Sequence, residues 1–572
     1  MGPRNKTGGK RVRGTLKGRR VEPQARADVR ALLGSDPRRR DLLIEYLHRI
    51  QDRYGCLGAA HLVALAEELK MAMAEVFEVA TFYHHFDVVK EGDAAPPAVT
   101  VRVCDSLSCE MAGAHALLKS LPAVLGSGVR VLHAPCVGRC ETAPVAIVGQ
   151  NPVPHATSEN VKALVDAGAV AHPARTGAAE HPALDTVTPG HIDYAAYKKE
   201  GGYSLAAACS RGERQAADVI ALLSDSGLRG LGGAGFPAGR KWKLVSAEPA
   251  PRLLAINIDE GEPGTFKDRY YLERDPHRFL EGALIASWAV GIAEIYIYLR
   301  DEYHGCRAIL EGEIAALQAD PPYPLPPIHL RRGAGAYICG EESAMIESIE
   351  GKRGEPRLRP PYVAQVGLFG RPTLEHNMET LHWVRTIVEK GAEWFASQGR
   401  HGRKGLRSFS VSGRVKKPGV HLAPAGITVK ELIDEFCGGM LDGHTFYAYL
   451  PGGASGGILP AAMGDIPLDF DTLNQYGCFI GSAAVIILSD KDTAAMAARN
   501  VMKFFSEESC GQCTPCRVGT LKALDLMHER NWDKPLIEEL SQAMMDSSIC
   551  GLGQAAPNPA LSVLKYFPRE VE

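Results

Sequence analysis

The chain has 572 residues, 45% of them hydrophobic, and a formal net charge of −3. This composition is typical of a globular protein with several domains, and the small charge argues against nucleic acid or an anionic membrane as the main partner. No run of 18 or more apolar residues is present, so we expect no membrane-spanning helix. The fourteen cysteines have spacings typical of metal ligands, and we therefore expect a reducing, cytoplasmic compartment.

Hydrophobic periodicity predicts helices and then strands in the N-terminal part of the chain. Residues 1–24 form a basic, glycine-rich arm, which we expect to be disordered because no apolar segment follows it. Apolar residues at steps of three and four predict helices between residues 25 and 90. Alternation in Val99–Cys104 predicts a strand, and further strands are expected at 129–133 and 145–148, with a helix between the first two of these strands.

The rest of the chain predicts a large α/β domain, a small α+β unit and a helical C-terminal region. A segment rich in Ala, Pro and Gly precedes them. The apolar run Leu253–Asn257 predicts a buried strand, and Ser408–Ser412 predicts a strand of the small unit. The expected boundaries are 1–24 for the arm, 25–164 for the N-terminal module, 165–200 for a linker, 201–404 for the α/β domain, 405–490 for the small unit and 491–572 for the helical region.

Four cysteines near the C-terminus predict an iron–sulfur site. Cys510, Cys513 and Cys516 form a C-x2-C-x2-C motif, and Cys550 follows later. Three thiolates in one tight turn suit three corners of a cubane cluster, and a remote cysteine can supply the fourth. Zinc more often uses two separated C-x2-C pairs. The spacing therefore favours a [4Fe–4S] cluster over zinc.

A second cysteine set lies in the N-terminal module. Cys104 and Cys109 form one pair, Cys136 and Cys140 form another, and each pair follows a predicted strand. Two such pairs can hold a two-iron cluster or zinc, and they can also be unliganded thiols. The looser spacing of the first pair favours [2Fe–2S], but it leaves the other two interpretations open.

A glycine-rich loop lies at the start of the α/β domain. The segment from Gly230 to Gly235 contains the pattern G-x-G-x-x-G, which in a dinucleotide-binding Rossmann unit follows a strand and opens a helix. Here the preceding residues read as a helix with a glycine cap, and Pro237 and Gly239 stand where the next helix would start. We therefore reject the standard Rossmann fingerprint. The loop amides can still hold a phosphate, aided by Lys241, or they can form a plain turn.

Two further loops carry clustered carboxylates. Asp259 and Glu262 follow the predicted strand Leu253–Asn257, at the strand end where open α/β sheets bind ligands. Glu341 and Glu342 stand at the start of a predicted helix. Such residues are also common in solvated loops and as helix caps, so the pattern alone leaves both interpretations open.

Five segments in sequence order resemble the flavin-containing, NADH-oxidising subunit of respiratory complex I and its diaphorase relatives. They are LRGLGGAGFPAGRKW, INIDEGEPGTFKDR, GAGAYICGEES, HNMET and SCGQCTPCR. Residues 25–165 resemble the thioredoxin-like [2Fe–2S] partner of that subunit. The resemblance implies a multidomain α/β fold with a helical plus thioredoxin-like N-terminal module, a Rossmann-like FMN domain, a ubiquitin-like α+β domain and a C-terminal helical bundle that carries [4Fe–4S].

The resemblance also implies cofactor-binding residues. The eight cysteines named above are expected to hold the two clusters, and NAD(H) is expected to stack on Phe236 and Tyr362, with Glu262 and Glu342 nearby. The residues expected to complete the FMN and nucleotide site are Gly230, Gly232, Gly233, Gly235, Lys241, Asn257, Asp259, Tyr337, Gly340, Glu341, Asn377 and Thr380.

Several positions depart from the family pattern. Leu231 replaces a familiar arginine, Arg359 and Tyr362 stand where lysine and phenylalanine are common, and His376 replaces an asparagine. Tyr362 keeps an aromatic face for stacking. We expect Glu342 to accept the hydroxyls of the adenosine ribose and to repel a 2′-phosphate, which favours NAD over NADP.

The fusion of the two units in one chain resembles the diaphorase (beta) subunit of soluble NAD-dependent formate dehydrogenases. We expect electrons from formate, oxidised in a partner subunit with a molybdenum or tungsten pterin cofactor and further iron–sulfur clusters, to reach NAD⁺ in a hetero-oligomer. Hydride transfer between flavin and nicotinamide requires no side-chain acid or base, so no catalytic residue is expected. The alternatives are the diaphorase of an NAD-reducing nickel–iron hydrogenase, a complex I module, a zinc-stapled scaffold without activity and a self-sufficient dehydrogenase.

Overall fold

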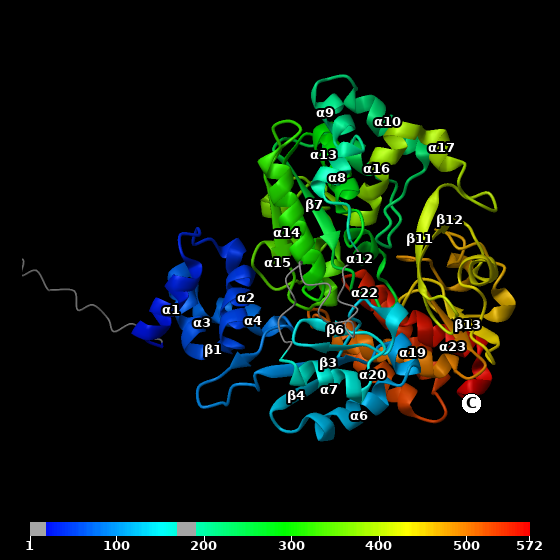
Figure 1. The fold of residues 1–572 in the computed structure, drawn as a ribbon. Helices are drawn as coiled ribbons and strands as arrows, with labels where there is room; N and C mark the ends of the chain where they lie inside the picture. The colour runs from blue at the N-terminus through cyan, green and yellow to red at the C-terminus, as the bar shows by residue number, and fades with distance from the viewer. Residues whose placement is uncertain (1–18, 169–189) are drawn as a thin grey trace, which may run out of the picture.

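The computed structural model describes residues 19–168 and 190–572 (Figure 1). Most of the expected basic arm and much of the expected linker, residues 1–18 and 169–189, lie outside the described residues. Among the described residues, no helix is both long and apolar enough to cross a membrane.

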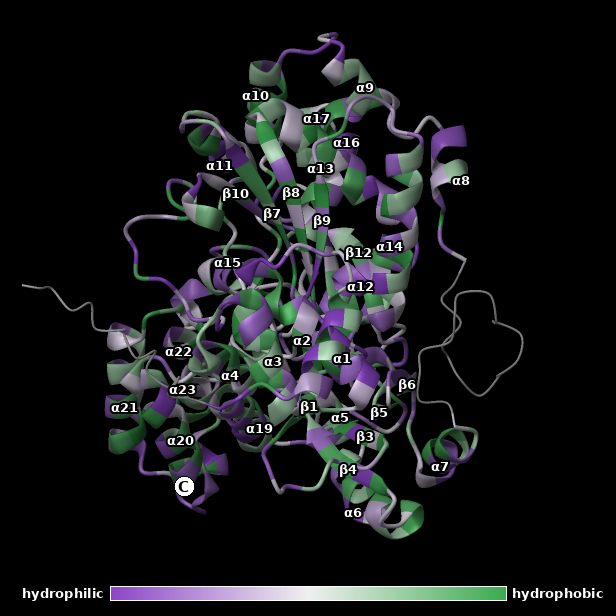
Figure 2. Cartoon of the chain, turned by 90° about the vertical axis from the view of Figure 1, so that its left-hand side faces the viewer, coloured by the Kyte–Doolittle hydropathy of each residue, from purple (hydrophilic) through white to green (hydrophobic). Residues whose placement is uncertain are grey.

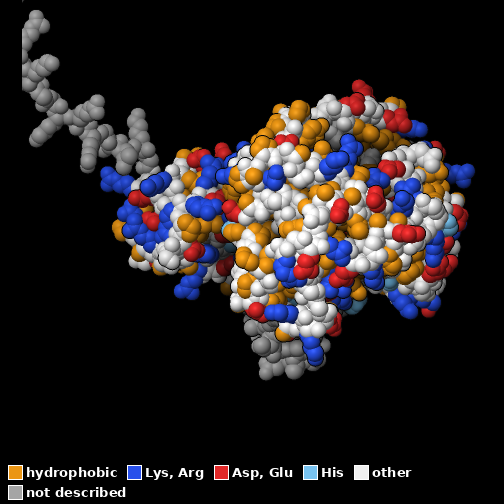
Figure 3. Space-filling view, turned by 90° about the horizontal axis from the view of Figure 1, so that it is seen from above, with side chains coloured by type: hydrophobic (Ala, Val, Ile, Leu, Met, Phe, Trp, Pro, Cys, Tyr) orange, Lys and Arg blue, Asp and Glu red, His pale blue; other side chains and the backbone are white. Residues whose placement is uncertain are grey.

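The N-terminal helices form a separate lobe, which projects on the left in Figures 1 and 3 and carries several basic side chains on its surface. Two short parallel strands tie the beginning of α3 to the segment after α4. This agrees with the predicted helices between residues 25 and 90. The elements are α1 (Pro23–Leu33), α2 (Leu43–Tyr54), β1 (Leu57–Gly58), α3 (Ala59–Leu69), α4 (Met73–Phe82) and β2 (Val88–Val89).

A four-stranded sheet with the order β4-β3-β5-β6 follows, and it has a hydrophobic core of its own. Its first two strands are parallel and the others pair antiparallel. The three strands predicted here are confirmed, but the predicted helix is interrupted at Ala112–Gly113, where a glycine with φ of 95° starts a new helix. The elements are β3 (Val99–Cys104), α5 (Leu107–Met111), α6 (Ala114–Leu125), β4 (Val129–Ala134), β5 (Ala146–Val148), β6 (Asn151–Val153) and α7 (Ser158–Asp166).

The central unit is a parallel sheet with the order β10-β7-β8-β9. The chain runs outward from β7 to β9 and then returns to the other side of β7 as β10. This reversal makes the carboxyl ends of β7 and β10 a topological switch point, where open α/β sheets bind ligands. The strands are β7 (Arg252–Ile258), β8 (Ile292–Leu299), β9 (Ile328–Arg332) and β10 (Thr373–Asn377).

Helices cover both faces of this sheet, which is why the sequence of β7 is a nearly continuous apolar run. Leu254 and Ile256 belong to one hydrophobic core, whereas Leu253 and Ala255 belong to a second core shared with the N-terminal and C-terminal helices. Figure 2 shows β7 and β8 mainly in the hydrophobic colour. The helices are α8 (Tyr194–Lys199), α9 (Ser204–Ser210), α10 (Ala216–Ser226), α11 (Ala238–Ser246), α12 (Lys267–Leu272), α13 (Pro276–Val290), α14 (His304–Ala319), α15 (Glu342–Ile349), α16 (Met378–Lys390) and α17 (Ala392–Ala396), with the 3₁₀ turn η3 (Tyr337–Gly340) before α15.

Two details differ from the sequence-based expectations. A helix, α8, lies inside the range expected to be a linker, because Asp193 caps its first turn and Tyr194 and Tyr197 are buried. The glycine loop does follow a helix, as predicted, but α11 begins directly after it despite Pro237 and Gly239. Proline is compatible with a helix start because its missing N–H needs no partner there.

A mixed five-stranded sheet and a helical bundle complete the chain. The sheet order is β12-β11-β15-β13-β14, and the bundle packs into the second core beside the N-terminal helices. The elements are β11 (Leu406–Gly413), β12 (Gly419–Pro424), α18 (Val429–Glu431), β13 (Phe446–Leu450), β14 (Leu459–Pro460), β15 (Ala484–Ser489), α19 (Ala494–Glu507), α20 (Thr514–His528), α21 (Lys534–Ser547), α22 (Gly551–Ala555) and α23 (Asn558–Tyr566).

Candidate functional site

The glycine-rich loop lies against the carboxyl end of β10. A Cβ atom added to Gly232 would lie 2.9 Å from the Cβ of Asn377, which is closer than real Cβ contacts allow. Gly235 has φ of 65°, and an added Cβ there would lie 2.4 Å from an aromatic ring. The amide of Leu231 donates a 2.9 Å hydrogen bond to Thr380 Oγ1. The loop therefore requires glycine at two positions, and its backbone is fixed to the start of α16.

Two asparagines stand side by side at the switch point. Asn257 near the end of β7 lies opposite Asn377 on β10. Asn257 Nδ2 donates to the backbone oxygen of Gly340 at 2.9 Å, and Asn377 Nδ2 donates to Asp268 Oδ2 at 2.6 Å. These contacts bring the glycine loop, both strand ends and η3 to one place, as expected for the residues predicted to hold a flavin.

Asp259 presents an unsatisfied acceptor at this place. Its amide donates to Asn257 Oδ1, but its Oδ2 atom is buried and has no hydrogen-bond partner among the described residues. Burial raises the pKa of Asp259 well above its usual value. A buried acceptor without a partner is costly unless a ligand supplies a donor. Together with the close glycine approach, this atom fits a bound planar heterocycle with N–H groups, such as the ring system of FMN.

Tyr337 connects this loop region with the C-terminal helices. Its hydroxyl donates to Glu262, which also accepts from the amide of Ser455 at 2.8 Å. The amide of Tyr337 donates to Glu508 Oε2 at 2.9 Å, and its ring centroid lies 4.9 Å from that of Phe504. Burial raises the pKa of Glu262. The predicted cofactor residues Glu262 and Tyr337 therefore lie beside the helix that leads to the C-terminal cysteines.

The remaining charged residues predicted for the site are paired with one another. Glu341 caps α15 and forms an ion pair with Arg359, whose Nη1 atom lies 3.1 Å from Glu342 Oε1. Lys241 Nζ lies 3.1 Å from Glu375 Oε2 and donates to the Glu375 backbone oxygen at 2.9 Å. Burial and Glu375 raise the pKa of Glu342. Glu342 thus has an arginine at hand, a relationship that the sequence alone did not reveal.

The two aromatic residues predicted to stack on the nucleotide are exposed. Phe236 is 36% and Tyr362 is 56% exposed, and the guanidinium of Arg240 lies 5.5 Å from the centroid of the Phe236 ring. His376, one of the departures from the family pattern, is buried, and its Nε2 atom accepts from Trp242 Nε1 at 2.8 Å. Because successive strand residues face opposite sides, His376 points away from the side taken by Asn377.

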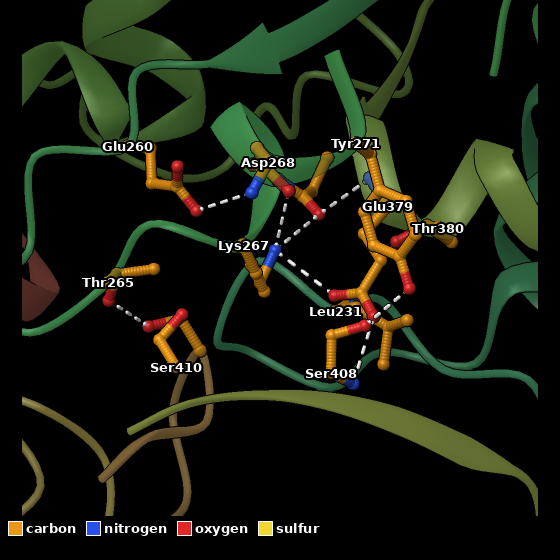
Figure 4. A network of polar contacts seen from close by, with 12 residues as sticks. Leu231, Glu260, Thr265, Lys267, Asp268, Tyr271, Glu379, Thr380, Ser408 and Ser410 are labelled. Atoms are coloured by element: carbon orange, nitrogen blue, oxygen red, sulfur yellow. Dashed lines mark hydrogen bonds and ion pairs between the residues drawn. The ribbon is translucent and has the colours of Figure 1, made fainter. Parts of the chain in front are cut away.

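A buried polar network under the site was not predicted. Lys267 is 1% exposed, and its Nζ atom lies 2.7 Å from Asp268 Oδ1, 3.1 Å from Glu379 Oε2 and 3.2 Å from Asn377 Oδ1 (Figure 4). Burial opposes the charge of Lys267, but the two carboxylates outweigh this effect and raise its pKa. Glu260 accepts from the amide of Asp268 at 2.8 Å, and burial and Asp268 raise its pKa to about 7. The only signal in the sequence is a Lys-Asp-Arg run that opens a short helix.

The N-terminal cysteines come together at the ends of β3 and β4. The Sγ atoms of Cys136 and Cys140 are 3.4 Å apart, and Cys104 shares hydrogen bonds with Cys109 and Cys136. These bonds from its neighbours lower the pKa of Cys136 well below the usual thiol value. All four are buried and none is in a disulfide. Four converging thiols, one of them favoured as thiolate, fit a sulfur-ligated metal cluster.

The C-terminal cysteines also converge. Cys510 and Cys513 lie between α19 and α20, Cys516 is in the first turn of α20, and Cys550 caps α22. Burial raises the pKa of Cys516 to about 11 and that of Cys550 to about 12, and the thiol of Cys510 acts on both. Ser509 Oγ lies 3.3 Å from Cys516 Sγ. Such thiols lose their protons when they bind metal, so the set fits a cluster that is inserted with proton release.

Two buried arginines bind the loop of the N-terminal cysteines to the sheet. Arg300, just after β8, donates from Nη2 to the backbone oxygen of Cys136 at 2.7 Å and from Nη1 to the backbone oxygen of Glu260. Arg269 Nε donates to the backbone oxygen of Gly138 at 2.9 Å. Both side chains are almost fully buried. The sequence offered no signal for these contacts, because they join segments far apart in the chain.

Four protein-family models match separate parts of the chain. The Nuo51 FMN-binding domain matches residues 223–386, and the thioredoxin-like [2Fe-2S] ferredoxin matches residues 29–169. The NADH-ubiquinone oxidoreductase-F iron-sulfur binding region matches residues 496–572. The SLBB domain matches residues 408–459, within the unit expected to be ubiquitin-like. The predicted multidomain fold and the predicted FMN, NAD(H), [2Fe–2S] and [4Fe–4S] cofactors are confirmed by these matches.

Curated relatives and solved structures agree with the family models. An NADH-quinone oxidoreductase flavin-family chain of Rhizobium meliloti (strain 1021) is 39% identical over 399 residues, which cover 67% of this chain and 94% of that protein. The mitochondrial NADH dehydrogenase [ubiquinone] flavoprotein 1 of Dictyostelium discoideum is 41% identical over 62% of this chain and 78% of that protein. A chain of an NAD⁺-reducing [NiFe]-hydrogenase in the H2-reduced state has a TM-score of 0.80 and 30% identity, covering 94% of this chain and 93% of that chain.

Proposed function

Because the chain belongs to the family of the NADH-oxidising flavoprotein subunits of complex I type, we propose that it is a diaphorase that carries electrons between NAD(H) and two iron–sulfur clusters through FMN. The observation that carries this proposal is the position of the switch point between the two cysteine sets. Tyr337 joins it to Glu508, next to the C-terminal cysteines, and Arg300 joins it to Cys136. A cofactor bound there is adjacent to both cluster sites.

The residues of this chain bind and orient the cofactors. In the proposal the loop amides from Gly230 to Gly235 and Lys241 hold the FMN phosphate, while Asn257, Asp259 and Asn377 meet the ring. FMN, when bound, exchanges two electrons with a nicotinamide and single electrons with clusters. Phe236 and Tyr362 supply stacking faces for NAD(H), and the eight converging cysteines hold the clusters. No side-chain acid or base takes part in this assignment.

We propose formate as the source of the electrons. The partner is then a catalytic subunit with a molybdenum or tungsten pterin cofactor and further iron–sulfur clusters. The support is the fusion of the [2Fe–2S] unit and the flavin unit in one chain, which resembles soluble diaphorases more than separate complex I subunits. All fourteen cysteines are free, which agrees with the cytoplasmic location that we also propose.

A specific observation favours a second candidate, the diaphorase of an NAD⁺-reducing hydrogenase. The hydrogenase chain described above covers 94% of this chain, whereas the complex I relatives cover about two-thirds of it. The two candidates share the flavin and cluster chemistry, and they differ only in the partner subunit.

Two measurements test the proposal. The isolated holoprotein is expected to reduce ferricyanide with NADH, and full iron content without this activity would contradict the diaphorase assignment. Affinity purification from the native host, followed by elemental analysis of the copurified subunits, distinguishes the electron sources. Molybdenum or tungsten with formate-dependent NAD⁺ reduction supports formate, whereas nickel with hydrogen-dependent reduction contradicts it.

A further inference from the structure

Two histidines meet where the N-terminal helices contact the central sheet. His48 on α2 and His85, just after α4, have ring centroids 4.8 Å apart. Asp301, just after β8, reaches the same place, and one potential ligand atom from each of the three residues lies within 4.8 Å of the others. None of the three belongs to the flavin, nucleotide or cysteine sites described above.

Each histidine uses one ring nitrogen and leaves the other free. His48 Nε2 lies 2.8 Å from the backbone oxygen of Gly333, so this nitrogen carries the proton and donates it. His85 Nδ1 lies 2.7 Å from Asp301 Oδ2. The opposite nitrogens, His48 Nδ1 and His85 Nε2, are buried and have no hydrogen-bond partner among the described residues. A histidine that binds a metal commonly donates its other N–H to a carbonyl or a carboxylate in this manner.

The free nitrogen of His48 is also available as a lone pair. His48 is 2% exposed, and burial together with the charge of Arg332 lowers its pKa well below the usual value, so the ring is neutral. A buried, neutral imidazole whose acceptor atom has no partner is costly to the protein. A bound cation would satisfy that atom, and the partly exposed side chain of His85 gives solvent access to the site.

The local charge balance leaves room for a cation. Burial opposes ionisation of Asp301, but His85 and Arg332 outweigh it and hold the pKa of Asp301 well below its usual value. Arg332 also pairs with Asp52 at 2.6 Å, so two carboxylates face one arginine. Neighbouring His304 is neutral, because burial lowers its pKa to about 3. Two further arginines, Arg102 and Arg307, lie near enough to act on the charges of this group.

We propose that His48 Nδ1 and His85 Nε2 bind one divalent transition-metal ion of the zinc class, with Asp301 orienting His85 and water completing the coordination. Imidazole nitrogen is a preferred ligand of Zn²⁺, Co²⁺, Ni²⁺ and Cu²⁺. The histidines belong to the N-terminal lobe, whereas Asp301 and Gly333 belong to the sheet. The ion therefore fastens the N-terminal lobe to the flavin-binding unit, and its role is structural.

The test uses the full-length holoprotein with both clusters in place, because empty cysteine sites would also bind zinc. The protein is dialysed against EDTA, reloaded with Zn²⁺ alone, freed of excess metal and analysed for zinc and iron. We expect about one zinc per chain in the wild type and at least a tenfold loss in the double variant His48→Gln/His85→Gln. The control His61→Gln, which lies in the same lobe and stacks on Tyr54, should bind as much zinc as the wild type.

A second measurement guards against misfolding of the double variant. His48→Phe keeps an aromatic ring in the buried position but removes the ligand atom. Added Zn²⁺ should raise the thermal midpoint of the wild type and of His61→Gln by several degrees, and it should leave His48→Phe unchanged at equal iron content. Equal zinc in the wild type and the double variant, or the same thermal shift in His48→Phe as in the wild type, would overturn the proposal.

Discussion

Arg300 donates a hydrogen bond of 2.7 Å from Nη2 to the backbone oxygen of Cys136. Arg300 is 4% exposed, and it helps to lower the pKa of the Cys136 thiol. A buried positive charge at a cluster ligand stabilises the reduced, more negative state of the cluster. The flavin-binding unit therefore contributes electrostatically to the cysteine site of the N-terminal module.

Replacing this charge should lower the potential of one cluster only. For Arg300→Gln we expect the midpoint potential of the [2Fe–2S] cluster to fall by about 30–60 mV, which corresponds to about 0.7–1.4 kcal/mol for one electron. Redox titration followed by electron paramagnetic resonance measures it, and the [4Fe–4S] signal in the same samples is the internal control. An unchanged [2Fe–2S] potential, or an equal shift of both clusters, would contradict the assignment.

The close approach of Gly232 to Asn377 predicts a loss of flavin. In Gly232→Ala the new Cβ would lie 2.9 Å from Asn377 Cβ, so the loop must move away from β10. We expect at least a tenfold weaker retention of FMN with both clusters present, as measured by flavin fluorescence after gel filtration. Gly128→Ala is the matched control, because an added Cβ there meets nothing within 4 Å. Normal FMN content in Gly232→Ala would remove the loop from the binding site.

The pairing of Glu342 with Arg359 predicts a change in nucleotide preference. If Glu342 repels a 2′-phosphate, Glu342→Gln leaves Arg359 free to bind one, and the ratio of kcat/KM for NADPH to that for NADH should rise about tenfold or more. The gain should disappear in Glu342→Gln/Arg359→Gln. An unchanged ratio in the single variant rejects the role of Glu342, and an equal gain in the double variant rejects the role of Arg359.

Glu260 predicts a dependence of stability on pH. Its pKa is raised from 4.5 to about 7, so between these values the folded protein holds a proton that the unfolded chain has released. The free energy of unfolding therefore falls as the pH rises from about 4.5 to 7, by up to about 3 kcal/mol from this group. Glu260→Gln cannot ionise, so its thermal midpoint should fall less between pH 5 and pH 7.5. The same fall in both proteins would show that Glu260 titrates normally.

Local signals in the sequence predicted much of this protein. The alternation in Val99–Cys104 and the apolar run Leu253–Asn257 correspond to β3 and β7, because side-chain burial sets these periods directly. The C-x2-C-x2-C motif placed three thiols together, since they share one turn. Cys550 joins them through the packing of α22, which the sequence only allowed as a fourth ligand.

Non-local contacts could not be predicted in the same way. The return of β10 to the side of β7 depends on strand pairing across more than a hundred residues, and it creates the switch point that Asn257 and Asn377 share. The burial of Lys267 is set by Glu379 on another helix, and no local pattern distinguishes it from a surface lysine. The chemistry of the site was visible in its motifs, whereas its arrangement required the fold.

Anaerobic reduction of the purified holoprotein by NADH, followed by low-temperature electron paramagnetic resonance, tests the central claim most directly. The account predicts bleaching of the flavin absorbance and the appearance of reduced-cluster signals in the same sample, with neither change in the FMN-depleted Gly232→Ala variant. Cluster reduction by NADH that proceeds equally without FMN, or no reduction in a protein with full flavin and iron content, would contradict it.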